Sequence, residues 1–194
     1  MPLVPEEVLP FRTVDCPDEA AQLLKQGLVR CVVADVMVAF DTPDSRPVRA
    51  AAAGLLIPEA GRTAVTGPEW VIGFASAAWL HTGFTGATAV PDELEVIVPP
   101  GRRRPRRHGV RGRQVTLAAE QVTYVGPVAV TDPVRTAADV ARDLAAPVAV
   151  AALRRLGELY DVRPDDVLQV LASMRYARGA ATARQAVRAW ADSG

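Results

Sequence analysis

Several residue types are scarce in this sequence, and each scarcity excludes a class of protein. Cysteine occurs only at Cys16 and Cys31 in 194 residues. This predicts no disulfide framework, and no Cys/His spacing matches a zinc site, so we expect two ordinary reduced thiols. No apolar run approaches the roughly 18 to 20 residues of a membrane span, because Asp35 interrupts the best candidate, residues 32–40. The N-terminus carries acids where a signal peptide needs positive charge, so we expect a cytoplasmic protein without membrane contact.

Motifs for nucleotide binding and catalysis are also missing. Neither a Walker-type nor a dinucleotide glycine pattern occurs, and Ser76 lacks the flanking glycines of a Gly-x-Ser-x-Gly elbow. Asp92, Glu93 and Glu95 could suggest a magnesium-dependent nuclease, but such a site also needs a lysine at the position that Ile97 occupies. We therefore predict no catalytic residue, no metal site and no cofactor, and interpret these acids as solvent-facing groups that discourage edge pairing.

One stretch, residues 101–113, is strongly enriched instead, and we call it the arginine stripe. It contains seven arginines, one histidine and no acid. Removing those seven from the 22 basic residues leaves 15 against 22 acidic ones, so the rest of the chain is acidic. Guanidinium groups bind phosphate through paired hydrogen bonds, and nucleic acid is the commonest partner of such a segment. The predicted nucleic-acid-binding residues are Arg102, Arg103, Arg104, Arg106, Arg107, His108, Arg111 and Arg113.

Other interpretations of the arginine stripe stay open. It could be a solvated basic loop without a dedicated ligand, or a loop that docks on the acids of the protein itself. No aromatic residue lies in it, which argues against a base-stacking platform for single strands. The second histidine, His81, is predicted to be packed and hydrogen-bonded within a helix.

The N-terminal part, residues 1–41, is predicted to be a remnant of a winged helix. Residues 1–16 are expected to be an extended lead-in. Pro17, Asp18 and Glu19 open a short helix that Gly27 ends. The β-branched residues within 28–40 predict one long strand or a strand pair. One helix followed by strands matches the back half of a winged helix without its front half.

Residues 42–194 are predicted to form an α+β domain. Helices are expected over residues 48–56 and from Pro68, capped by Thr66 or Gly67, to about His81, with Gly83 ending the second. Residues 93–98 predict a half-buried strand with its acids on the exposed face. Further short strands are predicted over 114–117, 122–125 and 128–130, so that the arginine stripe is a loop between strands.

The C-terminal third is predicted to be helical. Thr131, Asp132 and Pro133 start a helix that runs to about Leu144. Arg135 and Asp139, one turn apart on this helix, are expected to form an exposed pair. Further helices over 148–160, 164–176 and 182–191 make residues 147–194 a helical subdomain. The fold class is therefore α+β, with short strands and helices mixed in its central part.

Four segments together resemble a bacterial family. They are residues 74–81 (FASAAWLH), 94–104 (LEVIVPPGRRR), 120–123 (EQVT) and 128–139 (VAVTDPVRTAAD). In this order and spacing, over roughly residues 17–190, they resemble the AbiEi antitoxins of abortive-infection (type IV) toxin–antitoxin systems and related regulators. Relatives commonly carry a winged helix in front, and some carry a nuclease-like domain behind. Here the winged helix is shortened, and we expect no nuclease-like domain because the sequence ends at Gly194.

The resemblance implies a DNA-binding transcriptional regulator or antitoxin rather than an enzyme. It favours DNA over RNA and implies a cognate toxin protein as a second partner. Two other functions stay open. The chain could be an interaction module or adaptor that neutralises or recruits an acidic protein partner without binding DNA, or a metal-dependent nuclease.

Overall fold

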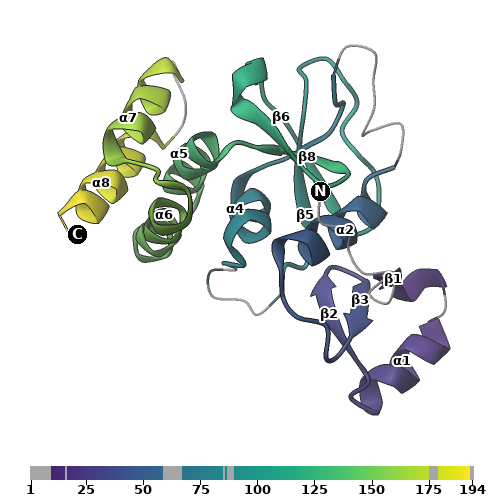
Figure 1. Ribbon diagram of the computed structural model, residues 1–194. Helices are drawn as coiled ribbons and strands as arrows, with labels where there is room; N and C mark the ends of the chain where they lie inside the picture. Colours follow the sequence, from purple (N-terminus) through teal and green to yellow (C-terminus); the bar gives the residue numbers. More distant parts are fainter. Residues whose placement is uncertain are drawn as a thin grey trace.

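The protein is described by a computed structural model that covers residues 10–15, 17–58, 67–84, 86, 90–174 and 179–192. The lead-in over residues 1–9, the thiol of Cys16, a cap at Thr66 and a helix end at Tyr176 lie outside these residues. Figure 1 shows a small N-terminal sheet, a central sheet with its helices, and a helical C-terminal part. The predicted α+β fold class is confirmed.

The described residues of the N-terminal part form a three-stranded antiparallel sheet and one α-helix. Strands β1 (Phe11–Arg12), β2 (Val29–Val33) and β3 (Val36–Ala39) lie in the order β1-β3-β2, and α1 (Pro17–Lys25) precedes the β2–β3 hairpin. The predicted strand pair is therefore present. Two hydrogen bonds of 3.0 Å join the guanidinium of Arg12 to the carboxylate of Asp35 in the hairpin turn. In the described residues, only the 3-10 turn Thr13–Asp15 lies between β1 and α1.

The central sheet has the strand order β6-β5-β4-β8-β7. Its strands are β4 (Val71–Ile72), β5 (Leu94–Val98), β6 (Val110–Gln114), β7 (Val122–Val125) and β8 (Val128–Thr131). Strand β4 is antiparallel to β5 and parallel to β8, while β5 and β6 are parallel. The β7–β8 hairpin confirms the prediction of two short strands in that region.

Two predictions for the central sheet are wrong. The helix expected from Pro68 begins only at Phe74, because Val71 and Ile72 form a strand paired on both sides. Strand β5 is buried on both faces rather than half buried, since it lies inside the sheet and Ile97 packs beneath Gly73. Gly73 has no side chain, and a Cβ there would lie 2.6 Å from the Cδ1 atom of Ile97.

The observed helices agree more closely with the helices predicted from the sequence. They are α2 (Arg46–Leu56), α4 (Phe74–Thr82), α5 (Pro133–Asp143), α6 (Ala146–Tyr160), α7 (Pro164–Ser173) and α8 (Ala180–Ala191). Gly83 ends α4 in the left-handed conformation, as predicted, and Asp132 caps α5 by accepting hydrogen bonds from the amides of Val134 and Arg135. No helix in the described residues is both long and apolar enough to cross a membrane.

In the part of the chain that the structure describes, buried side chains form three clusters around these elements. The first joins β2, β3, α2 and one face of the central sheet, so the N-terminal sheet shares a core with the central part. The second lies among α5, α6, α7 and α8. The third covers the other face of the central sheet near Phe74 and Ile97. Helix α4 packs against both β5 and α5 and so connects the sheet to the helical part (Figure 1).

Candidate nucleic-acid interface

The arginine stripe begins as a loop and ends as a strand. After β5 the chain crosses over and returns as β6, with Val110 opposite Leu94 in the parallel register. The expectation of a loop throughout, followed by a strand over 114–117, is therefore wrong, because the strand occupies residues 110–114. The buried side chain of Val110 anchors its first residue to the core. The second half of the arginine stripe thus forms one edge of the central sheet.

Contacts within the protein hold the loop over residues 101–109. The carbonyl of Gly109 accepts a hydrogen bond of 2.8 Å from the amide of Leu94, and Gln114 donates one of 2.7 Å to the carbonyl of Arg102. Gly109 has φ +74°, and a Cβ there would lie 2.8 Å from the Cβ of Ala34 in the β2–β3 turn. The loop therefore presents its side chains from a backbone that is fixed against both sheets.

Most of the predicted binding residues lie on the surface. The exposed ones are Arg102, Arg103, Arg104, Arg106, Arg107, His108 and Arg111. Arg102 approaches Glu69 only to 3.8 Å, and Arg107 donates a long hydrogen bond of 3.4 Å to the carbonyl of Leu55. The other four arginines in this set make no ion pair within the described part of the chain. Neighbouring cations without carboxylate partners repel one another and attract anions.

Arg113, the last predicted binding residue, is held by the protein itself. Its guanidinium lies 2.6 Å from Glu95 and 2.5 Å from Asp143, and 4.1 Å above the ring of Phe74. Burial alone would lower the pKa of Arg113, but the two carboxylates hold it above its ordinary value. Arg113 therefore links β6 to the end of α5, and its charge is compensated.

Of the acids near β5 that the sequence predicts to face solvent, Asp92 and Glu93 do so and Glu95 does not. The side chain of Glu95 is only 13% exposed and faces Arg113, because β6 covers this edge of β5. Burial raises the pKa of Glu95, and the nearby charge of Arg113 opposes that effect. Asp92 and Glu93 are exposed. Among the described residues, no group of three or more His, Cys, Asp or Glu side chains could hold a metal ion.

A buried polar cluster at the start of α5 is the feature that sequence reasoning missed. Arg135 donates to Asp139 at 2.9 Å and to the side chain of Gln121 at 2.8 Å. The expectation of an exposed Arg135–Asp139 pair is wrong, because their side chains are 4% and 0% exposed between packed helices. Burial raises the pKa of Asp139, while the charge of Arg135 lowers it. The sequence did contain a signal for this cluster, because its residues lie in two of the four segments that resemble the AbiEi antitoxins.

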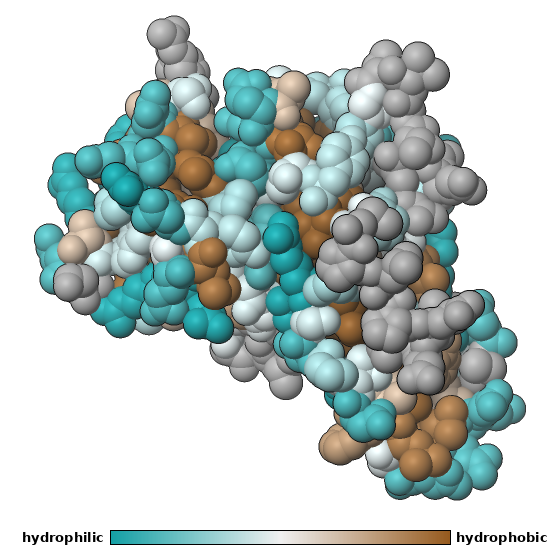
Figure 2. All heavy atoms as spheres, viewed as in Figure 1, coloured by the Kyte–Doolittle hydropathy of each residue, from teal (hydrophilic) through white to brown (hydrophobic). Residues whose placement is uncertain are grey.

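The N-terminal part is a poor candidate for phosphate contact. Residues 10–41 contain three basic and five acidic side chains. Asp18 and Glu19 occupy the exposed first turn of α1. Leu24, Leu28 and Phe40 are exposed, and Figure 2 shows hydrophobic surface at the end of the molecule that α1 and the hairpin form. This end is more suitable for contact with a protein than with a polyanion.

His81 is buried rather than available to a ligand. Its Nε2 atom lies 2.8 Å from the carbonyl of Thr131, and its ring meets Tyr160 edge to face. The hydroxyl of Tyr160 also donates to the carbonyl of His81 at 3.0 Å. These contacts confirm the prediction of a packed, hydrogen-bonded histidine.

Comparisons with known proteins match the part of the chain that contains the four segments resembling AbiEi antitoxins. A family model described as the AbiEi antitoxin C-terminal domain matches residues 71–188, from β4 into α8. The chain is also similar to a solved structure, the RV2827C protein from Mycobacterium tuberculosis, with 17% sequence identity and a TM-score of 0.47. That similarity covers 91% of this chain and 65% of the other, so this chain spans just under two thirds of its length. A search of curated proteins found no match.

Proposed function

The chain belongs to the family of the AbiEi antitoxin C-terminal domain, and on that premise we propose that it is a non-catalytic, nucleic-acid-binding regulator of the antitoxin type. The observation that carries the proposal is the group of exposed arginines in the arginine stripe, several of them without a carboxylate partner in the described residues. These arginines contact the phosphates of DNA. A cognate toxin protein is the second partner that the family description suggests.

The position of the arginines defines what kind of binding they supply. They lie on a loop and at a sheet edge, and their guanidinium groups suit phosphate oxygens through paired hydrogen bonds. Phosphate contacts fix register and add affinity but carry no direct sequence information. Arg113 is excluded from this set because Glu95 and Asp143 already hold it. The interface is therefore electrostatic and weakly selective for sequence.

A salt titration tests the proposal. Binding of a DNA duplex and of a matched RNA is measured by fluorescence anisotropy between about 50 and 200 mM salt. If each of five arginines neutralises one phosphate, log K falls against log salt with a slope of about −4 to −5. The test variant replaces Arg102, Arg103, Arg104, Arg106 and Arg107 by alanine, and we expect it to lose most of the affinity and most of the slope.

A matched control separates a local effect from a change in net charge. Five exposed arginines of the helical part, Arg154, Arg155, Arg163, Arg184 and Arg188, are replaced by alanine in a second variant. Both variants lose five positive charges, so a non-specific effect would weaken binding equally in both. DNA retention that is unchanged in the arginine-stripe variant would overturn the proposal.

A protein-binding module is the second candidate function, and the hydrophobic end of the N-terminal part favours it. Leu24, Leu28 and Phe40 are 43%, 54% and 64% exposed, and the amide of Phe40 donates to the carbonyl of Leu28, which holds two of these residues side by side. Exposed apolar surface of this kind commonly marks a protein contact. A protein that co-purifies with the chain, together with no DNA shift at low salt, would favour this function over DNA binding.

A further inference from the structure

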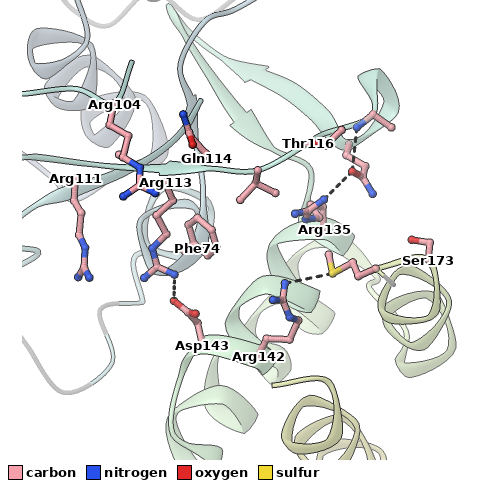
Figure 3. A pocket seen from close by; sticks show the side chains of 15 residues that line it. Phe74, Arg104, Arg111, Arg113, Gln114, Thr116, Arg135, Arg142, Asp143 and Ser173 are labelled. Atoms are coloured by element: carbon pink, nitrogen blue, oxygen red, sulfur yellow. Dashed lines mark hydrogen bonds and ion pairs between the residues drawn. The ribbon is translucent and has the colours of Figure 1, made fainter. Parts of the chain in front are cut away.

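A cavity of about 900 Å³ lies where the edge strand β6 faces α5 and the end of α7. Figure 3 shows Arg104, Arg111 and Arg113 on one side of it and Arg135 and Arg142 on the other. The two sides come from segments that are distant in the sequence. The cavity therefore brings part of the arginine stripe opposite the buried polar cluster of α5.

The cavity carries an excess of positive charge. Among the described residues, its lining contains five arginines and one carboxylate, that of Asp143. Two further carboxylates lie behind the lining, Glu95 beside Arg113 and Asp139 beside Arg135. Five guanidinium groups against three carboxylates leave two positive charges. The excess falls on Arg104 and Arg111, which are exposed and make no ion pair in the described residues.

Three of the five arginines are held in place before any ligand binds. Arg113 is fixed by two carboxylates and the ring of Phe74, and Arg135 by Asp139 and Gln121. Arg142 contacts the sulfur of Met174 at 3.5 Å and lies 3.6 Å from Asp139. A site whose charged groups are already ordered loses less entropy when a ligand binds.

We propose that this cavity binds the phosphate monoester group of a ligand. A phosphate monoester is a dianion near neutral pH, which matches the excess of two charges, whereas each phosphate within a nucleic-acid backbone carries one charge. Guanidinium groups bind phosphate oxygens in pairs, and Thr116 adds a hydroxyl to the lining, whereas the hydroxyl of Ser173 already donates to the carbonyl of Val170. The volume lies in the range of pockets for small ligands. The two sources tested below are a free mononucleotide and the 5′ end of a nucleic-acid strand.

This site goes beyond the proposed function, because it is a recessed cavity in which Arg104 and Arg111 of the arginine stripe face residues of α5. It can exist whether or not the loop binds duplex DNA. Arg103 and Arg106 serve as controls for Arg104 and Arg111, since they are exposed on the same arginine stripe but do not line the cavity. A pair of double variants can therefore remove the same charge from the same segment.

Titration calorimetry of the full chain tests the inference with AMP, adenosine, and one oligonucleotide prepared with either a 5′-phosphate or a 5′-hydroxyl end. We expect the phosphorylated probes to bind, and adenosine not to bind. We expect Arg104→Ala/Arg111→Ala to weaken phosphate binding by about ten-fold or more. We expect Arg103→Ala/Arg106→Ala to leave it within about two-fold. All four replaced side chains are exposed, and circular dichroism confirms that both variants fold.

The probes distinguish the two sources of the phosphate. Binding of AMP identifies a free nucleotide as the source of the phosphate. Tighter binding of the 5′-phosphate than of the 5′-hydroxyl oligonucleotide, without binding of AMP, identifies a strand end. Both results support the site. The absence of AMP binding together with equal affinity for the 5′-phosphate and 5′-hydroxyl oligonucleotides, or an equal loss in the two double variants, would overturn it. Duplex binding by the same variants is measured separately, so failure of the loop interface is distinguishable from failure of this site.

Discussion

Protonation of His81 should destabilise the folded protein. The side chain is 2% exposed, and its Nε2 atom lies beside the carbonyl of Thr131. Burial lowers the pKa of His81 to about 4; the hydrogen bond to Thr131 opposes this, and the charges of Arg46 and Arg49 add to it. The unfolded chain binds the proton at the ordinary pKa of about 6.5. Stability due to the neutral imidazole is therefore present above pH 6.5 and is lost as the pH falls from there through 4.

The size of the effect follows from proton linkage. With pKa values of about 6.5 unfolded and about 4 folded, the free energy of unfolding falls by about 2 kcal/mol between pH 7.5 and pH 5. Glu95 and Asp139 act in the opposite direction, because burial raises their pKa values and a raised carboxyl pKa favours the folded state as pH falls. A comparison with a variant that lacks only the imidazole cancels these two contributions.

Urea unfolding of the wild-type chain and of His81→Gln, measured from pH 7.5 to pH 5, checks the prediction. Glutamine keeps an N–H donor for the carbonyl of Thr131 but does not titrate. We expect the wild-type protein to be the more stable one at pH 7.5 and its advantage to shrink by about 2 kcal/mol at pH 5. A difference between the two proteins that stays constant across this range would refute a buried, neutral His81.

Three further outcomes are expected. Asp139→Asn should lower the free energy of unfolding by about 3 to 5 kcal/mol in a denaturant titration, because it leaves the buried charge of Arg135 without a carboxylate; a loss below about 1 kcal/mol would contradict the burial of this pair. Gly112→Ala should displace Pro105, whose ring occupies the space of the added Cβ, and weaken duplex binding with little change in helix content by circular dichroism; wild-type affinity would show that the loop geometry is unimportant. Purified protein should leave DNA and RNA intact with magnesium or manganese, and cleavage that co-elutes with the protein would contradict a non-catalytic function.

Local sequence predicted the helices well because their ends depend on neighbouring residues. Pro17 opens α1, Asp132 and Pro133 open α5, and Gly83 ends α4, and each acts within one turn of its own position. The strands were less predictable. Residues 71–72 continue the helical pattern that begins near Pro68, and only pairing with two strands from distant segments makes them part of the sheet.

The candidate interface likewise has features that could be predicted from the sequence and features that could not. The arginine stripe and its charge excess follow from composition, so a cationic segment at residues 101–113 could be predicted without a structure. Which arginines remain available depends on carboxylates that arrive from other segments. Glu95 and Asp143 compensate Arg113, and the placement of α5 against β6 creates the cavity. Neither the ion pairs nor the cavity could be predicted from the sequence, because ion pairing and burial require side chains that are distant in the chain to meet in space.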